Sequence, residues 1–188
     1  MWVMDIKYPQ IGVCGLSCRF CPRYHTDGFS RCYGCKTESR MGAGCPFITC
    51  AVKKKGIEFC WDCEEGESCQ KWLKHRELGK LYDSFICYQG LEENIRTASE
   101  SGVESFVKSQ IAKEKFLERM LDEFNEGRSK SYYCIAATVM TTEDLKEGLA
   151  RAAELSKDLD IKDKSNALHA ALDEIAARKN YCLRLRKH

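Results

Sequence analysis

Cysteines at short, regular spacing are the residues of this sequence that can do chemistry. Cys18 and Cys21 form one C-x2-C pair, and Cys32 and Cys35 form another after ten intervening residues. Each pair can fold into a tight turn whose two sulfurs point at one ion, and two such turns complete a tetrahedral four-sulfur site. Gly34 has the backbone freedom that such a turn requires. The spacing predicts a metal site, with zinc as the first choice because zinc suits four thiolates and needs no redox partner.

The remaining N-terminal cysteines predict a second site. Cys60 and Cys63 form a third C-x2-C pair, Cys69 follows six residues later, and Cys45 and Cys50 flank the sequence PFIT. We expect Cys45 or Cys50, or both, to join the third pair, and Cys69 can replace one of them. Ten cysteines exceed the eight that two sites need, so a bridged pair of metals and two free thiols are both open. The sequence predicts about two zinc ions per chain, with ten candidate ligands: Cys14, Cys18, Cys21, Cys32, Cys35, Cys45, Cys50, Cys60, Cys63 and Cys69.

The segment CGLSCRFC, from Cys14 to Cys21, also matches the C-x3-C-x2-C signature that holds a four-iron cluster in radical S-adenosylmethionine enzymes. That chemistry needs a large barrel of alternating strands and helices. Here seven more cysteines follow within 48 residues, and helical patterns come next. The sequence therefore disfavours radical chemistry. An iron–sulfur or thiol redox protein that uses the loop from Cys14 to Cys21 stays an alternative to zinc, because four thiolates serve both metals.

Composition indicates a soluble protein of the cytoplasm. The 188 residues include 13 cysteines, an odd number that occurs in C-x2-C pairs and therefore favours reduced thiols over disulfides. No apolar run is long enough to cross a membrane, and the first ten residues lack the pattern of a signal peptide. The net charge of +2 argues against a dedicated nucleic-acid-binding protein. Basic residues at Lys53–Lys55, Arg184 and Arg186 leave an RNA-binding module as a further alternative.

The chain divides into two predicted parts. Residues 1–75 hold the ten candidate ligands, all three prolines and eight of the 13 glycines, which is typical of a loop-rich module that needs metal to fold. Residues 76–188 form a mainly helical domain. Apolar periodicity predicts helices around 72–81, 91–98, 103–124, 145–155 and 161–175. In the first of these, Trp72, Leu78 and Leu81 roughly mark one face.

Local signals refine this prediction. Thr141 and Asp144 resemble a capping box at the start of a helix, and Asn180 marks a helix end. Residues 132–140 and 182–187 are rich in β-branched and aromatic residues or alternate in polarity, so we expect two paired strands. The predicted fold class is α+β: a small metal-stapled cysteine-rich N-terminal module and a mainly helical C-terminal part with a small sheet.

The order of the cysteine motifs resembles a known family. The chain has CGLSC-x2-CP from Cys14, C-x-GC from Cys32, single cysteines at 45 and 50, KGIE-x-C-x2-CE from Lys55, and Cys69. This succession, over roughly residues 11–75, resembles the cysteine-rich family catalogued as domain of unknown function 3795. The stretch 125–134 and the closing LRLR at 183–186 are similar to its longer members. The resemblance implies metal binding, with zinc expected, through the cysteines named, and it implies no reaction.

The sequence thus predicts a cytoplasmic protein with structural zinc that acts through an unknown macromolecular partner, without a membrane. No Ser-His-Asp set, phosphate-binding glycine loop or HExxH motif is apparent. Whether the protein is an enzyme is left open, and any catalytic residue is unknown.

Overall fold

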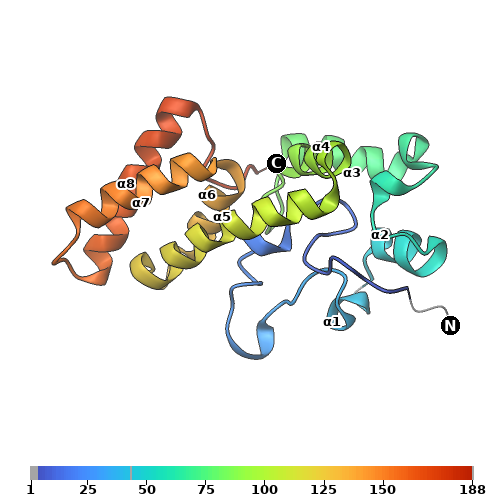
Figure 1. The fold of residues 1–188 in the computed structure, drawn as a ribbon, viewed down its shortest axis with the longest axis horizontal. Coiled ribbons are helices and arrows are strands. Elements are labelled where there is room, and N and C mark those ends of the chain that lie inside the picture. Colours follow the sequence, from blue (N-terminus) through green and yellow to red (C-terminus); the bar gives the residue numbers. More distant parts are fainter. Residues whose placement is uncertain (1–3, 43, 188) are drawn as a thin grey trace.

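The computed structural model describes residues 4–42 and 44–187, and this part of the chain is all-helical. Short helical turns dominate the N-terminal third, and longer helices pack side by side in the rest (Figure 1). The α helices are α1 (Glu38–Met41), α2 (Pro46–Ile48), α3 (Gln70–Leu81), α4 (Leu91–Ser101), α5 (Val103–Phe124), α6 (Lys130–Val139), α7 (Thr142–Leu155) and α8 (Ile161–Lys179). The shorter elements are 3-10 turns at Cys18–Phe20, Gly28–Ser30, Cys60–Asp62 and Gly66–Ser68, and a π-helical continuation of α2 at Thr49–Lys55.

The predicted α+β class is wrong, since the described residues contain no strand and only one isolated β-bridge, between Ile11 and Ser17. The first expected strand, 132–140, lies mostly within α6. Its residues Tyr133 to Ala137 are all buried, so the apolar run reflects a helix that is covered on several sides. The second, 182–187, is an irregular tail. In this tail, Arg186 turns back and binds Asp83 through both its side chain and its backbone amide.

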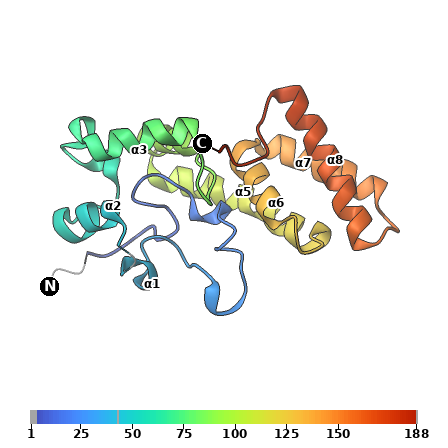
Figure 2. The ribbon, with the colours of Figure 1, turned by 180° about the vertical axis from the view of Figure 1, so that it is seen from behind.

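The C-terminal helices form the main core. Apolar side chains of α5, α6, α7 and α8 meet in one cluster, with Leu117, Met120, Leu145, Leu168 and Leu172 almost fully buried. Helices α7 and α8 run side by side, as Figure 2 shows from behind. Gly148 permits this approach, because a Cβ at that position would lie 2.7 Å from a methyl carbon of Leu172.

Local sequence signals for three of these helices are confirmed. Thr141 accepts a hydrogen bond from the backbone amide of Asp144 at 3.2 Å, which caps the start of α7. Asn180 ends α8 in the left-handed conformation with φ of 58°. Helix α5 spans the predicted 103–124.

The cysteine-rich segments pack against α3, α4 and α5 through two smaller apolar clusters. Ile11 and Phe59 meet Ala98 and Phe106, while Leu16 joins a cluster with Trp72 of α3 and with Leu91 and Ile95 of α4. On α3, Trp72 is buried but Leu78 and Leu81 are exposed, so the expected apolar face is narrower than the sequence indicated. The domain boundary at residue 75 stays a prediction.

Candidate metal centre

The four cysteines of the first two C-x2-C pairs line one cavity of about 30 Å³. A 3-10 turn at Cys18–Phe20 places Cys18 and Cys21 together, and the amide of Cys21 donates to the carbonyl of Cys18 at 3.0 Å. The amide of Cys32 donates to the carbonyl of Arg23 at 2.9 Å, which brings the second pair back to the first. These two pairs therefore share a site through local turns.

Gly34 is required by this arrangement. Its φ of 123° lies in the region that other residues avoid, and a Cβ would lie 2.3 Å from the carbonyl oxygen of Pro9. The second pair can therefore approach the N-terminal segment only because residue 34 has no side chain.

One pair of sulfurs in this site is in direct contact. The Cys18 thiol donates to the Cys35 sulfur at 3.4 Å, and the backbone amide of Cys35 donates to the Cys18 sulfur at 3.3 Å. The hydrogen bond from Cys18 lowers the pKa of Cys35 to about 7, against the opposing effect of burial, and the charges of Arg40 and Lys36 add to this lowering. The pKa of Cys18 is raised, because it holds the shared proton and is buried. The pair is thus prepared to lose a proton and bind a cation.

A second group of cysteines lines another cavity, of about 90 Å³. Its members are Cys50 of the π-helical segment, Cys60 and Cys63 at the 3-10 turn Cys60–Asp62, and Cys69 directly before α3. Burial and the nearby Cys14 and Cys69 raise the pKa of Cys60 to about 12. The ammonium of Lys55 lies 3.2 Å from the Cys63 sulfur and 2.9 Å from a carboxylate oxygen of Glu65.

Two candidate ligands lie outside both cavities. They are Cys14 and Cys45. Burial, with a smaller contribution from the nearby sulfurs of Cys35 and Cys45, raises the pKa of Cys14 to about 12. Cys14 and Cys60 pack against the same apolar cluster, and Cys14 does not line the cavity of Cys18 and Cys21. The three cysteines of the radical signature therefore do not surround one cavity.

Across residues 4–42 and 44–187, no group of three or more histidine, cysteine, aspartate or glutamate side chains is gathered as tightly as a metal site requires. The chemistry of the first site still fits zinc. A zinc ion about 2.3 Å from each of four sulfurs sets the sulfur–sulfur distance near 3.8 Å. The Cys18 and Cys35 sulfurs, at 3.4 Å, are already close to that separation.

The other three cysteines lie apart from these cavities. Cys134 is 1% exposed inside the main core, and burial raises its pKa to about 12. Burial also raises the pKa of Cys87 to about 11, and Cys182 lies in the C-terminal tail.

A buried ion pair beside the first site was missed from the sequence. The ammonium of Lys36 lies 2.7 Å from a carboxylate oxygen of Glu58 and 3.9 Å from the centre of the Phe59 ring. Glu58 also accepts from the backbone amides of Lys7 and Tyr8. This pair ties the two cysteine segments to the N-terminal segment, and nothing in the local spacing of Lys36 and Glu58 could have shown it.

A second missed network joins α6 and α8. The Ser129 hydroxyl lies 2.8 Å from Nε2 of His169 and donates to Glu126 at 2.7 Å, while Ser165 donates to the same carboxylate. Both serines are buried, at 5% and 3% exposure, and the carboxylate binds the serines rather than the imidazole. This buried set of hydrogen bonds ties the start of α6 to α8.

Two of the basic residues that suggested RNA binding form ion pairs with carboxylates of the same chain. Lys55 is bound to Glu65, and Arg186 is bound to Asp83, while Lys53 and Lys54 are exposed. Within the part of the chain that the structure describes, no helix combines the length and apolar character needed to cross a bilayer.

Comparisons with family models, curated proteins and solved structures found no match for this chain, so the resemblance to domain of unknown function 3795 stays a prediction.

Proposed function

We propose that the protein binds zinc at two four-cysteine sites and that the metal holds its N-terminal third in shape. The observation that carries the proposal is the single cavity lined by Cys18, Cys21, Cys32 and Cys35. Its volume of about 30 Å³ is close to that of one water molecule, which suits a single ion better than a cluster of several atoms. Cys50, Cys60, Cys63 and Cys69 form the second proposed site, with Cys14 and Cys45 as free thiols.

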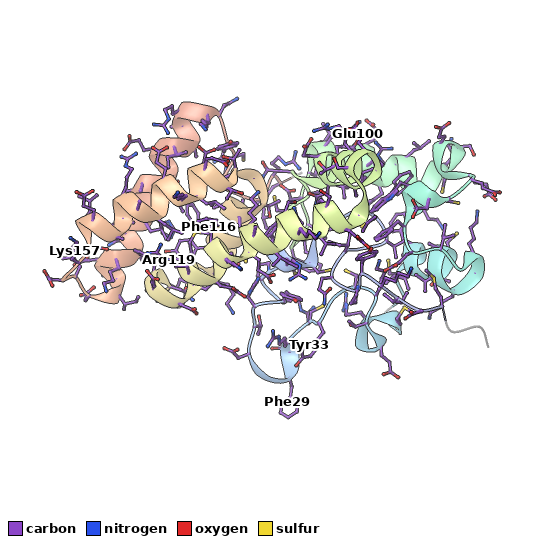
Figure 3. The ribbon with its side chains drawn as sticks, viewed as in Figure 1. Phe29, Tyr33, Glu100, Phe116, Arg119 and Lys157 are labelled. Carbon is purple, nitrogen blue, oxygen red and sulfur yellow. The ribbon has the colours of Figure 1, made fainter. Side chains whose placement is uncertain are left out.

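The proposed location is the cytoplasm, where thiols stay reduced and available to metal. The proposed mode of action is interaction with a protein partner. The segment 22–33, which joins the first cysteine pair to the second, projects from the molecule with Phe29 and Tyr33 exposed (Figure 3). The guanidinium of Arg31 lies 5.2 Å from the centre of the Tyr33 ring. Exposed aromatic and arginine side chains are the residues that contribute most to protein interfaces.

Elemental analysis of protein purified without oxygen tests the metal proposal. We expect about two zinc ions per chain and no visible absorption. Iron and sulfide in a brown protein would instead support the iron–sulfur alternative, for which the second cavity is the larger candidate. Less than about one metal ion of any kind per chain would overturn metal binding altogether.

A photoreactive amino acid placed at Phe29 in cells tests the partner proposal. We expect a discrete protein adduct from that position. The matched control places the same residue at Leu155, which is 69% exposed on α7. Equal adducts at the two positions, or none at either, would contradict a partner at the exposed segment.

A further inference from the structure

A cavity of about 580 Å³ lies beside the first cysteine site, with which it shares Leu16 and Ile86 as lining residues. Its walls come from one face of α5, the start of α4, the junction of α6 and α7, and the C-terminal tail. The CGLSCRFC segment closes one side with Leu16, Ser17 and Phe20. Cavities of roughly 300–1,000 Å³ are typical of small-molecule sites, and this one combines apolar walls with many polar side chains, among them Gln89, Asn94 and Thr97.

Two buried polar side chains in this cavity lack a hydrogen-bond partner, and a lysine lies on the same helix face as one of them. The side-chain oxygen of Gln110 and the hydroxyl of Ser17 are buried without a hydrogen-bond partner, in residues that are 8% and 5% exposed. Buried polar groups of this kind are rare and need an explanation. Lys113 follows Gln110 by three residues, so both lie on the same face of α5. A ligand that accepts from Ser17 and donates to Gln110 would satisfy both groups.

Lys113 is a cation with no carboxylate in ion-pair contact, although the charge of Asp144 acts on it from a longer distance and opposes the effect of burial. Its ammonium contacts the carbonyl oxygen of Thr138 at 3.4 Å and lies 5.5 Å from the centre of the Phe20 ring, and no carboxylate of the described residues forms an ion pair with it. Burial lowers its pKa to about 8. The positive ends of α4 and α7 lie at the same cavity, through Gly90 and Leu91 and through Thr141 and Thr142. An anionic group is therefore the missing partner.

The charges at the rim limit how many negative groups a ligand can carry. Glu93 and Glu143 line the cavity and are exposed, and Glu93 is bound to Arg96. A polyanion such as a nucleotide triphosphate would meet these carboxylates with one ammonium to offset them. A single carboxylate on an apolar body avoids this repulsion, because Leu16, Phe20 and Phe106 provide apolar walls.

We propose that this cavity binds a small organic monocarboxylate with a hydroxyl group and an apolar body, and that Lys113 pairs with its carboxylate. Gln110 and Ser17 bind its hydroxyl group. The proposal goes beyond metal binding, since none of these three residues is a candidate metal ligand.

Titration of the full chain with 3-phenyllactate and 2-hydroxybenzoate, followed by ligand-observed NMR and calorimetry, tests the proposal. We expect saturable binding of at least one of the two, with weaker binding of the uncharged 3-phenyl-1,2-propanediol and of ATP. Lys113→Met should weaken carboxylate binding roughly tenfold or more, since hydrogen bonds to charged groups are the strong ones. The control Lys115→Met removes an exposed lysine of the same helix and should change nothing. Absence of saturable carboxylate binding, or equal effects of the two substitutions, would overturn the proposal.

A measurement on the unaltered chain covers the case in which Lys113→Met does not fold. Reductive methylation with formaldehyde is followed by mass spectrometry at Lys113 and Lys115, with and without 3-phenyllactate. Slower modification at Lys113 alone supports the site, and unchanged rates at both lysines refute it. Because the protein's zinc content is measured in the same sample, failure here is distinguishable from failure of the metal proposal.

Discussion

At the scale of single residues, the contact between Cys18 and Cys35 carries the most chemical information. Cys18 holds the proton and Cys35 is the better anion, with a pKa of about 7, because the thiol of one donates to the sulfur of the other. A metal ion that replaces this proton would bind both sulfurs as thiolates. Exchange of the shared proton for a metal ion would convert this thiol pair into two metal ligands.

Serine substitutions separate ligands from core cysteines. We expect a serine at any one ligand of the first site to release one metal ion and to lower the free energy of unfolding by several kcal/mol, given the ~10–16 kcal/mol scale of structural zinc binding. The variants are Cys18→Ser, Cys21→Ser, Cys32→Ser and Cys35→Ser. Cys134→Ser should keep all metal and cost roughly 1–3 kcal/mol, because it places a hydroxyl in an apolar core. Elemental analysis and urea unfolding of each variant measure both effects.

Cys14→Ser is the control for the radical signature. Cys14 lies outside the cavity that Cys18 and Cys21 line, so this variant should keep the metal of the first site. Loss of iron and colour in this variant alone, with Cys32 and Cys35 dispensable, would instead show that a three-cysteine cluster is present.

Gly34→Ala tests the turn that shapes the first site. The added Cβ would meet the Pro9 carbonyl at 2.3 Å, so the backbone must move. We expect a loss of roughly 1–3 kcal/mol in the free energy of unfolding and weaker metal retention against a chelator. Gly42→Ala is the matched control, since a Cβ there meets nothing within 4 Å and Gly42 has a helical backbone. Equal metal retention by the two variants would show that the turn does not depend on glycine.

At the scale of elements, the start of α7 concentrates polar interactions on Asp144. This carboxylate is 1% exposed and binds Lys179 at 2.5 Å, the Thr141 hydroxyl at 2.8 Å and the Tyr181 hydroxyl at 2.9 Å. Burial acts to raise its pKa, but these three partners outweigh burial and lower the pKa to about 2. The charged form of Asp144 therefore stabilises the junction between α7, α8 and the tail.

The pH dependence follows from the sign of this shift. A depressed pKa means that the stabilisation is present above the ordinary value of 3.8 and is lost as the pH falls through about 2. Asp144→Asn should lower the free energy of unfolding by about 2 kcal/mol at neutral pH. The difference between the two proteins should shrink as the pH falls from 4 toward 2. A difference that stays constant over this range would contradict the role of the carboxylate charge.

At the scale of the whole molecule, the main core and the cysteine segments are built differently. The main core draws almost entirely on α5 to α8, whereas the cysteine segments contribute mostly short turns. Phe20 is the exception, because it packs into the main core from the CGLSCRFC segment. Apolar contacts through Ile11, Leu16 and Phe59 also join the cysteine segments to α4 and α5.

Removal of metal should therefore disorder the cysteine segments first. A chelator should broaden the amide NMR signals of residues 14–69, while α5 to α8 keep most of the far-ultraviolet circular dichroism. The control is the same protein after zinc is added back. If both regions lose structure together, the shared contacts through Phe20, Ile11 and Leu16 make the molecule one folding unit.

The sequence by itself determined the local features of this protein. The spacing within the pairs Cys18–Cys21 and Cys32–Cys35 predicted two tight turns, and the four cysteines line one cavity, while metal binding by them stays a prediction. Apolar periodicity predicted α5, and the Thr141 and Asn180 signals predicted two helix ends. These features depend on contacts within a few residues.

Only the tertiary structure decided the rest. Residues 130–139 form a helix rather than a strand because neighbouring helices bury it, which no local pattern of alanines and β-branched residues reveals. The choice of Cys50 and Cys69 over Cys45 for the second cavity depends on how α2 packs against the turns that follow. The cavity around Lys113 is formed by segments more than 100 residues apart in the chain, so its unpaired ammonium became visible only once those segments had come together.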